Sequence, residues 1–389
     1  MTVRPWIGGA AFDTVFIIGP AYAITALVLC FPGFFRSHEV TPLLWAALIV
    51  GVDVAHVYST LYRTYFDPVE FRRRRTLYVM APLLGWLGFA ALYSLGSMVF
   101  WRVLAYLAVF HFIRQQYGFM MIYRRHERGS PAIDRAAIYA ATLYPLLWWH
   151  CHTRHFSWFV EGDFFRLNRP WIADAALPVY LAILVVYGLR EWRSWRASRQ
   201  FNVPRNLLLA GTALSWWTGI IVLDSDLAFT ATNVLAHGIP YMALIWLYGR
   251  NAAHRAGAPP MLGLIPSGRF YSLAFAPLFV ALPILFAYVE EGLWDGLVWT
   301  EHPGLFRLFS GLPTIGESDI LVWLVPLLAL PQITHYVLDA FIWRLRQPEA
   351  NWRQTMFPDT IKKSATVPCD PPSARTRHGP GPRQPKRRC

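Results

Sequence analysis

The chain has 389 residues, of which 55% are hydrophobic, 16% aromatic and only 15% charged, and its mean hydropathy is +0.32. This composition excludes an ordinary water-soluble domain and belongs to the membrane class. The net charge of +13 does not require a nucleic-acid partner, because most of the arginines fall between apolar segments in a pattern typical of membrane topology.

Ten apolar runs have about the length of a transmembrane helix, and with short connections they fill nearly all of residues 1–346. They predict an all-α fold, a polytopic membrane bundle of about ten transmembrane helices with no separate soluble domain. In chain order the runs are 12–32, 43–62, 77–97, 100–122, 136–150, 173–189, 206–223, 227–249, 270–289 and 319–343.

Charge alternates between the loops that connect these runs. Basic loops, such as the one containing Arg72 to Arg75, follow the even-numbered runs, and acidic or neutral loops follow the odd-numbered ones. The positive-inside rule then predicts a multi-pass protein of the cell membrane with both termini in the cytoplasm. Two long aromatic outer loops, 151–172 and 291–318, are expected to lie on the membrane surface.

The tail, residues 347–389, is basic and rich in proline and has no apolar periodicity. We predict that it is disordered and that it contacts anionic lipid head groups. The four cysteines, Cys30, Cys151, Cys369 and Cys389, show no metal-ligand spacing, although Cys30 and Cys151 fall at the same outer edge and could pair.

Four runs carry a histidine well inside the apolar segment: His56, His111, His237 and His335. Ionisable side chains are costly in a bilayer, so such residues usually mark a functional site. Counting about 1.5 Å per residue from the outer end places the four at similar depth, and we predict that they meet near the midplane and bind a metal. The alternative for any single histidine is a structural hydrogen bond between helices.

Polar residues accompany three of these histidines at spacings that share a helix face. Asp53 precedes His56, Gln115 follows His111, and His335 has Gln332 before it and Asp339 after it. An imidazole that binds a metal usually donates its other N–H to a carboxylate or an amide, and these neighbours are of that type.

Arg114 lies about nine residues from the inner end of its run and needs a buried carboxylate partner. Asp53 is the first choice and Asp339 the second. We therefore predict that Asp53, Arg114, Gln115 and Asp339 take part in catalysis beside the metal.

Other motifs give no support for a different chemistry. His150, His152 and His155 cluster at an outer end, but their spacing is not that of a closed zinc site, so we interpret them as surface residues. No Walker A sequence, GxGxxG, GxSxG or HExxH is present, nor are the HxxxH and HxxHH boxes of membrane desaturases.

Four neutral imidazoles with nearby carboxylates suit iron, zinc or copper, and iron is favoured for oxidative chemistry. The leading hypothesis is an oxygenase-like or desaturase-like membrane oxidoreductase that acts on a hydrophobic small molecule, a lipid or an isoprenoid. One histidine on each of several spans resembles, in residue type alone, the bacterial β-carotene-cleaving dioxygenases of the bacterio-opsin-related type. The sequence around the histidines does not match that family, so no residue role is transferred.

Two alternatives remain open at this point. The first is a proton-coupled transporter or flippase with a relay through Asp53, His56, Arg114, His335 and Asp339. The second is haem held by two of the histidines.

Overall fold

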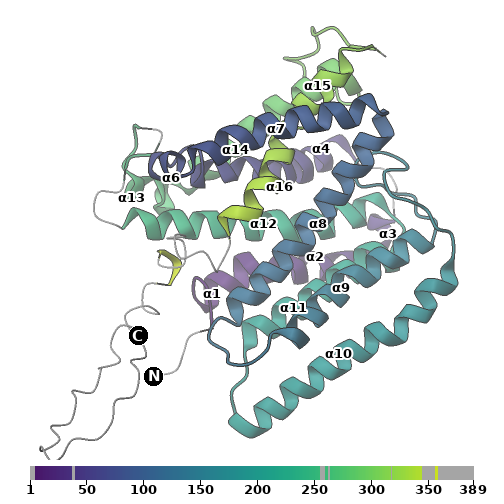
Figure 1. Cartoon of the computed structure of the whole chain (residues 1–389), viewed down its shortest axis with the longest axis vertical. Coiled ribbons are helices and arrows are strands. Elements are labelled where there is room, and N and C mark those ends of the chain that lie inside the picture. The colour runs from purple at the N-terminus through teal and green to yellow at the C-terminus, as the bar shows by residue number, and fades with distance from the viewer. Residues whose placement is uncertain are drawn as a thin grey trace, which may run out of the picture.

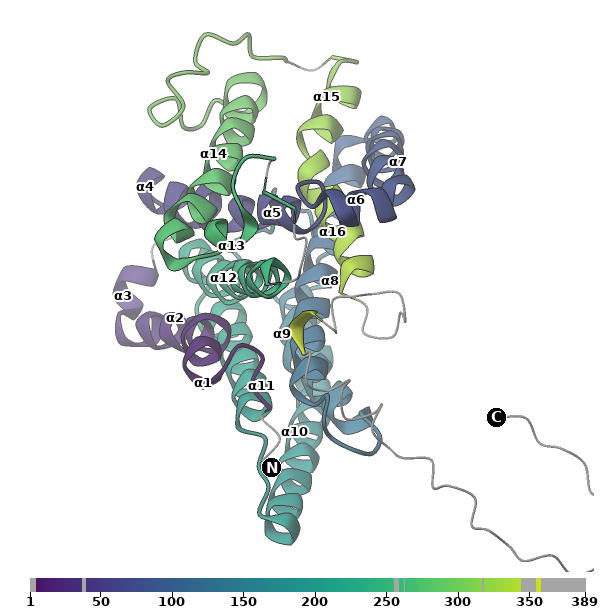
Figure 2. The same cartoon turned by 90° about the vertical axis from the view of Figure 1, so that its left-hand side faces the viewer.

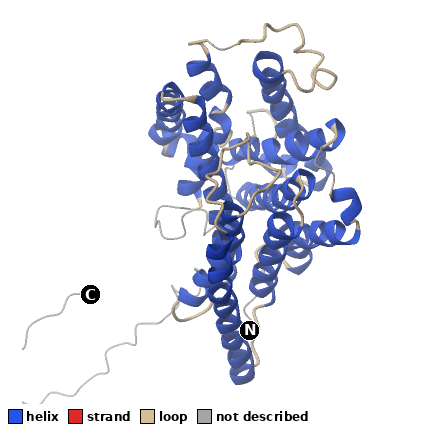
Figure 3. Cartoon of the chain, turned by 90° about the vertical axis from the view of Figure 1, so that its right-hand side faces the viewer, coloured by secondary structure: helices blue, strands red, loops and turns tan. Residues whose placement is uncertain are grey.

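The structure is a computed structural model, and it describes residues 5–36, 40–254, 259–261, 263–316, 318–343 and 355–357. Within these ranges the fold is all-helical and contains no strand (Figure 3). Six helices are long and apolar enough to cross a membrane. They are Ala10–Cys30, Pro42–Arg63, Arg75–Ser94 (α7), Ser97–Tyr123 (α8), Pro170–Ser198 (α10) and Leu273–Trp299.

Three of these helices are built from several segments. The first comprises α1 (Ala10–Phe12), a π-helical stretch (Asp13–Ile18) and α2 (Gly19–Cys30). The second comprises α4 (Pro42–Trp45), a π-helical stretch (Ala46–Val54), α5 (Ala55–Ser59) and a 3₁₀ turn (Thr60–Arg63). The last comprises a 3₁₀ turn (Leu273–Phe275), α14 (Ala276–Trp294) and a π-helical stretch (Asp295–Trp299). Short helices lie in the loops: α3 (Pro32–Phe35), α6 (Pro68–Arg73) and α13 (Ser267–Phe270).

A seventh candidate span is broken. Helices α15 (Leu321–Leu328) and α16 (Leu330–Ile342) meet at an angle of 52°. Pro331 lies in the first turn of α16 and has no backbone N–H, so the hydrogen-bond ladder of α15 cannot continue through it.

The remaining three predicted runs are also helical, but they do not have the apolar character of the other spans. They correspond to α9 (Ala132–Cys151), to α11 (Val203–Trp216) with a π-helical stretch (Trp217–Val222), and to α12 (Asp226–Ala253). The all-helical fold is therefore observed, while the predicted count of ten spans is not confirmed.

Helix α12 lies in the middle of the molecule (Figure 1). It packs against α2, α5 and α11, and Figure 2 shows it between α5 on one side and α2 and α11 on the other. Ser225 caps its start by accepting a hydrogen bond from the N–H of Ala228. Because protein surrounds α12, it can carry the buried polar residues Asn233 and His237.

The outer surface of the bundle exposes apolar side chains in the middle of several helices. Leu84, Phe110, Val185 and Leu285 are each more than half exposed in the middle of α7, α8, α10 and α14. Helix α10 lies at the edge of the molecule and packs mainly on α9 (Figure 1). Such surfaces suggest a membrane protein, because water-soluble monomers rarely expose large contiguous apolar areas.

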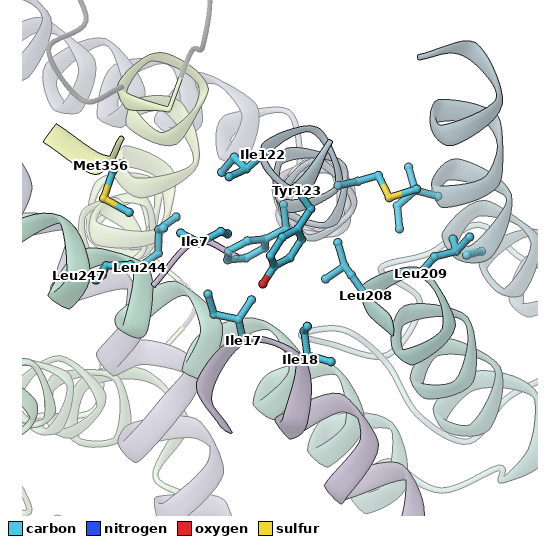
Figure 4. Packing of buried hydrophobic residues seen from close by; sticks show 14 of the residues in the cluster. Ile7, Ile17, Ile18, Ile122, Tyr123, Leu208, Leu209, Leu244, Leu247 and Met356 are labelled. Carbon is cyan, nitrogen blue, oxygen red and sulfur yellow. The ribbon is translucent and has the colours of Figure 1, made fainter. Parts of the chain in front are cut away.

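The described ends of the chain meet at one end of the bundle. Arg125, just after α8, donates hydrogen bonds to the carbonyls of Pro5 and Trp6, and its guanidinium lies 4.1 Å from the ring centre of Phe357. Figure 4 shows Ile7 and Met356 in the same cluster of buried apolar side chains. The rest of the predicted disordered tail, with Cys369 and Cys389, lies outside the described residues, and Cys30 and Cys151 are free thiols.

Candidate metal centre

Four helices bring one histidine each to a common point. They are α5 with His56, α8 with His111, α12 with His237 and α16 with His335, and one ligand nitrogen from each lies within 4.8 Å of the other three. The Nε2 atoms of His56 and His237 are 3.2 Å apart, and those of His111 and His335 are 3.0 Å apart. All four residues are at most 6% exposed. The predicted convergence is confirmed, and this buried group could hold a metal ion.

The spacing of the nitrogens suits a single ion. Imidazole nitrogens bind first-row metals at about 2.0–2.1 Å, which puts neighbouring ligands about 3.0–3.4 Å apart and opposite ligands about 4.2 Å apart. The distances of 3.0 and 3.2 Å fall in the range for neighbouring ligands, and 4.8 Å is slightly wider than the range for opposite ones. Only small movements would be needed to enclose an ion.

A glycine allows α12 to lie close to the helical segment that precedes His56. A Cβ added to Gly238 on α12 would lie 2.8 Å from Cγ1 and 3.1 Å from the carbonyl oxygen of Val52. Val52 belongs to the π-helical stretch Ala46–Val54 that directly precedes α5 and His56. A larger residue than glycine would therefore push His237 away from His56.

The position of His237 also depends on a proline. Pro240 has no N–H, so the carbonyl of Ala236, four residues earlier, loses its usual helical partner. The side chains of two residues on α8 approach this region: Gln116 Nε2 lies 3.5 Å from the Ala236 oxygen, and Gln115 Nε2 donates to the His237 oxygen at 2.9 Å. Gln115 was predicted to support the His111 ring, and this was wrong, because its amide reaches across to α12.

The ring of His237 is held by an aromatic contact. Phe112 stacks on it with the ring centres 3.6 Å apart and the planes 7° from parallel. The Nδ1 atom of His237 has no hydrogen-bond partner among the described residues. The stacking and the buried backbone of α12 therefore orient this imidazole without a polar partner for its outer nitrogen.

Carboxylates lie beside the other three histidines. Asp53 Oδ1 is 3.7 Å from His56 Nδ1, while Asp339 Oδ2 is 3.7 Å from His111 Nδ1 and 3.9 Å from His335 Nε2. These distances exceed those of direct hydrogen bonds, so the carboxylates act by their charge or after a small adjustment.

Gln332 does not support His335, which corrects a second prediction. Its amide donates to Glu290 at 2.6 Å. Glu290 comes directly after the predicted run 270–289, but it lies in the last turns of α14 and is 4% exposed. A charged residue near the end of an apolar run can be assigned to either side of the boundary, and here packing against α16 buries it.

Arg114 does not join the cluster. Its side chain is exposed, donates to the hydroxyl of Tyr139 at 2.7 Å and lies 4.6 Å from the ring centre of Tyr117. No carboxylate of the described chain pairs with it, so the expected ion pair with Asp53 or Asp339 is wrong. The long side chain reaches away from the histidines, and its charge is received by the hydroxyl of Tyr139 on α9 and by the aromatic face of Tyr117 on α8.

Two hydroxyl residues beside the histidines were missed from the sequence. Thr60 Oγ1 lies 2.7 Å from His335 Nδ1 and 2.8 Å from the hydroxyl of Tyr241, which donates to Asp339 Oδ1 at 2.6 Å. A signal was available, since Thr60 comes four residues after His56 and Tyr241 four residues after His237.

The outer histidines form no second site within the described chain. His150 Nε2 is 2.7 Å from the hydroxyl of Tyr106, His152 stacks on Trp148, and His155 Nδ1 is 2.6 Å from Asp224 Oδ2. Each has its own separate partner, in agreement with the interpretation as surface residues.

No protein-family model, curated protein or solved structure matches this chain. Its function is therefore argued from the site alone.

Proposed function

We propose that this chain is an integral membrane metal-dependent oxidoreductase that acts on a lipid or an isoprenoid. The observation that carries the proposal is the convergence of four buried imidazoles from four helices on one point. Four rings in such an arrangement make few hydrogen bonds to the rest of the protein, while they offer a borderline metal the ligand type that it prefers.

Iron is the metal that we favour, with zinc and copper as alternatives. A bound iron would supply redox chemistry that no side chain in the cluster can supply. The residues of the chain would hold the ion through Nε2 of His56, His111, His237 and His335, and Asp53 and Asp339 would balance part of its charge. Haem held by two of the histidines is less well suited. The nitrogens of all four rings lie within 4.8 Å of one another, so the other two rings would occupy the space that the macrocycle needs.

The substrate class follows from the surroundings of the site. The helices that carry the histidines expose apolar side chains such as Phe110 to the exterior. We propose about ten crossings of the cell membrane with both termini in the cytoplasm, so that a hydrophobic substrate and dioxygen would reach the site from the hydrocarbon region.

Elemental analysis of detergent-purified protein tests the metal. Wild type and the surface variant His150→Ala should contain nearly one metal ion per chain, and His111→Ala and His237→Ala should lose most of it, because each removes one of four ligands. Metal-free wild type, purified without chelators from cells grown in metal-supplemented medium, would overturn the proposal.

A proton-coupled transporter or flippase is the second candidate. It is favoured by the buried carboxyl of Glu290 and by Asp53 and Asp339, which lie beside the histidines. It predicts pH-dependent transport by metal-free protein in proteoliposomes. The oxidoreductase predicts instead that lipid extracts from cells with wild type and with His111→Ala differ in the mass of a lipid product.

A further inference from the structure

A second polar layer lies next to the histidines. Every histidine of the cluster is followed four residues later by a polar side chain, and these are Thr60, Gln115, Tyr241 and Asp339. Residues four apart share a helix face, so this layer is displaced from the histidines by about 6 Å along each helix. Three of its members, Thr60, Tyr241 and Asp339, meet across three helices.

The contacts among these three residues have only one consistent direction when a metal is bound. His335 turns its Nε2 toward His111, so Nε2 must keep its lone pair for the ion, and a neutral ring then carries its proton on Nδ1. Nδ1–H donates to Thr60 Oγ1, which leaves the Thr60 hydroxyl to donate to Tyr241. The Tyr241 hydroxyl in turn donates to Asp339 Oδ1.

We propose that Thr60 and Tyr241 are positioning residues that fix His335 in the ring orientation and tautomer needed to bind the metal. This inference rests on the proposed metal centre. Asp339 accepts the last hydrogen bond of the chain and also lies 3.7 Å from Nδ1 of His111. One carboxylate therefore acts on two of the four proposed ligands, on His111 by its charge and on His335 through Tyr241 and Thr60.

The packing favours one orientation of the His335 ring. Thr60 is 3% and Tyr241 1% exposed, and the Tyr241 ring stands edge-on to His335 with the ring centres 5.0 Å apart. Turning the imidazole over would place a carbon beside the Thr60 hydroxyl and remove its hydrogen bond with His335. The hydroxyl chain thus selects one orientation even before a metal enters.

Cobalt(II) titration of metal-depleted, detergent-purified protein tests the assignment, because its visible absorption reports both affinity and ligand set. Thr60→Val keeps the shape of the side chain and removes its hydroxyl, and Tyr241→Phe removes only the hydroxyl. Each should weaken cobalt binding about 10- to 100-fold and shift the absorption bands. Thr60→Ser retains a hydroxyl and should bind within about threefold of wild type.

Tyr62→Phe is the matched control. Its hydroxyl also lies on the second span, 3% exposed, but donates to the carbonyl of Phe279 at 2.9 Å and is not part of the chain. It should leave cobalt affinity and spectrum unchanged, even if it costs stability.

The outcomes separate the two proposals. Wild type that binds no cobalt overturns the metal centre itself. Wild type that binds cobalt, together with Thr60→Val and Tyr241→Phe that bind it with the same affinity and spectrum, overturns the positioning role alone. If Thr60→Val fails to fold, the comparison of Tyr241→Phe with Tyr62→Phe tests the positioning role, since each variant removes one buried phenol hydroxyl.

Discussion

Gly238 is the residue that allows α12 to lie close to the segment before His56 in the candidate metal centre. An alanine there would place its Cβ 2.8 Å from Val52 and 3.5 Å from the Cβ of His56. We expect Gly238→Ala to lower the free energy of unfolding by about 1–3 kcal/mol, the usual cost of overpacking. It should also lower the metal content, because α12 must move and take His237 with it. Thermal unfolding in detergent and elemental analysis measure the two effects.

The control for this prediction is Gly118→Ala on α8. A Cβ at Gly118 would meet nothing within 4 Å, so the variant should keep its metal and gain up to about 1 kcal/mol from helix propensity. Equal loss of metal in both variants would show that close approach at Gly238 is not the cause.

The four converging histidines could be predicted from the sequence, whereas most of their companions could not. Histidines inside apolar runs stand out because they are costly there, and depth could be counted from the run ends. The companions Gln115, Gln332 and Arg114 were misplaced because the spacing along a helix gives the face but not the partner helix that a long side chain reaches. The π-helical stretch Ala46–Val54 also shifts the register before His56, which 3.6-residue counting does not detect.

At the scale of elements, a buried ion cluster ties α9, α10 and α11 together. Asp134, at the start of α9 and 0% exposed, accepts two hydrogen bonds from Arg190 and lies 3.1 Å from Arg124 and 3.3 Å from Arg205. Asp134→Asn should lower the free energy of unfolding by about 3–5 kcal/mol, because it removes the acceptor charge from arginines that are partly buried. Denaturant or thermal unfolding in detergent measures the change.

Glu161→Gln serves as the comparison, because the Glu161–Arg166 pair is largely solvent-exposed. It should change the unfolding free energy by less than about 1 kcal/mol. If Asp134→Asn proves equally mild, the cluster does not hold the helices together.

The length of the apolar runs predicted which segments become helices, but it did not predict where a helix breaks or which helix lies in the centre of the bundle. The run 319–343 looks continuous in composition, and only the position of Pro331 breaks it into α15 and α16. The run 227–249 looks like an ordinary span, yet it forms α12, whose polar residues are accommodated because other helices surround it. Long-range packing of this kind is not encoded in the local pattern.

At the scale of the whole molecule, the contacts of Arg125 with Pro5, Trp6 and Phe357 place the two described ends of the chain together. A chain that crosses a membrane an even number of times must have both ends on one side, so this contact agrees with about ten crossings. It does not by itself say which side faces the cytoplasm. That choice rests on the basic loops, since Lys and Arg are retained on the cytoplasmic side.

Cysteine labelling tests the orientation. In a variant without the four native cysteines, Arg72→Cys and Glu161→Cys would each introduce one thiol, and both positions are exposed, in α6 and in the loop between α9 and α10. A membrane-impermeant maleimide added to intact cells should modify the thiol at 161 and not the one at 72, which should react only after the membrane is permeabilised. Equal labelling at both positions in intact cells would contradict the topology, and the reverse pattern would invert it. The reverse pattern would leave the four-histidine site in place but move the polar layer of Thr60, Tyr241 and Asp339 from its cytoplasmic to its external side.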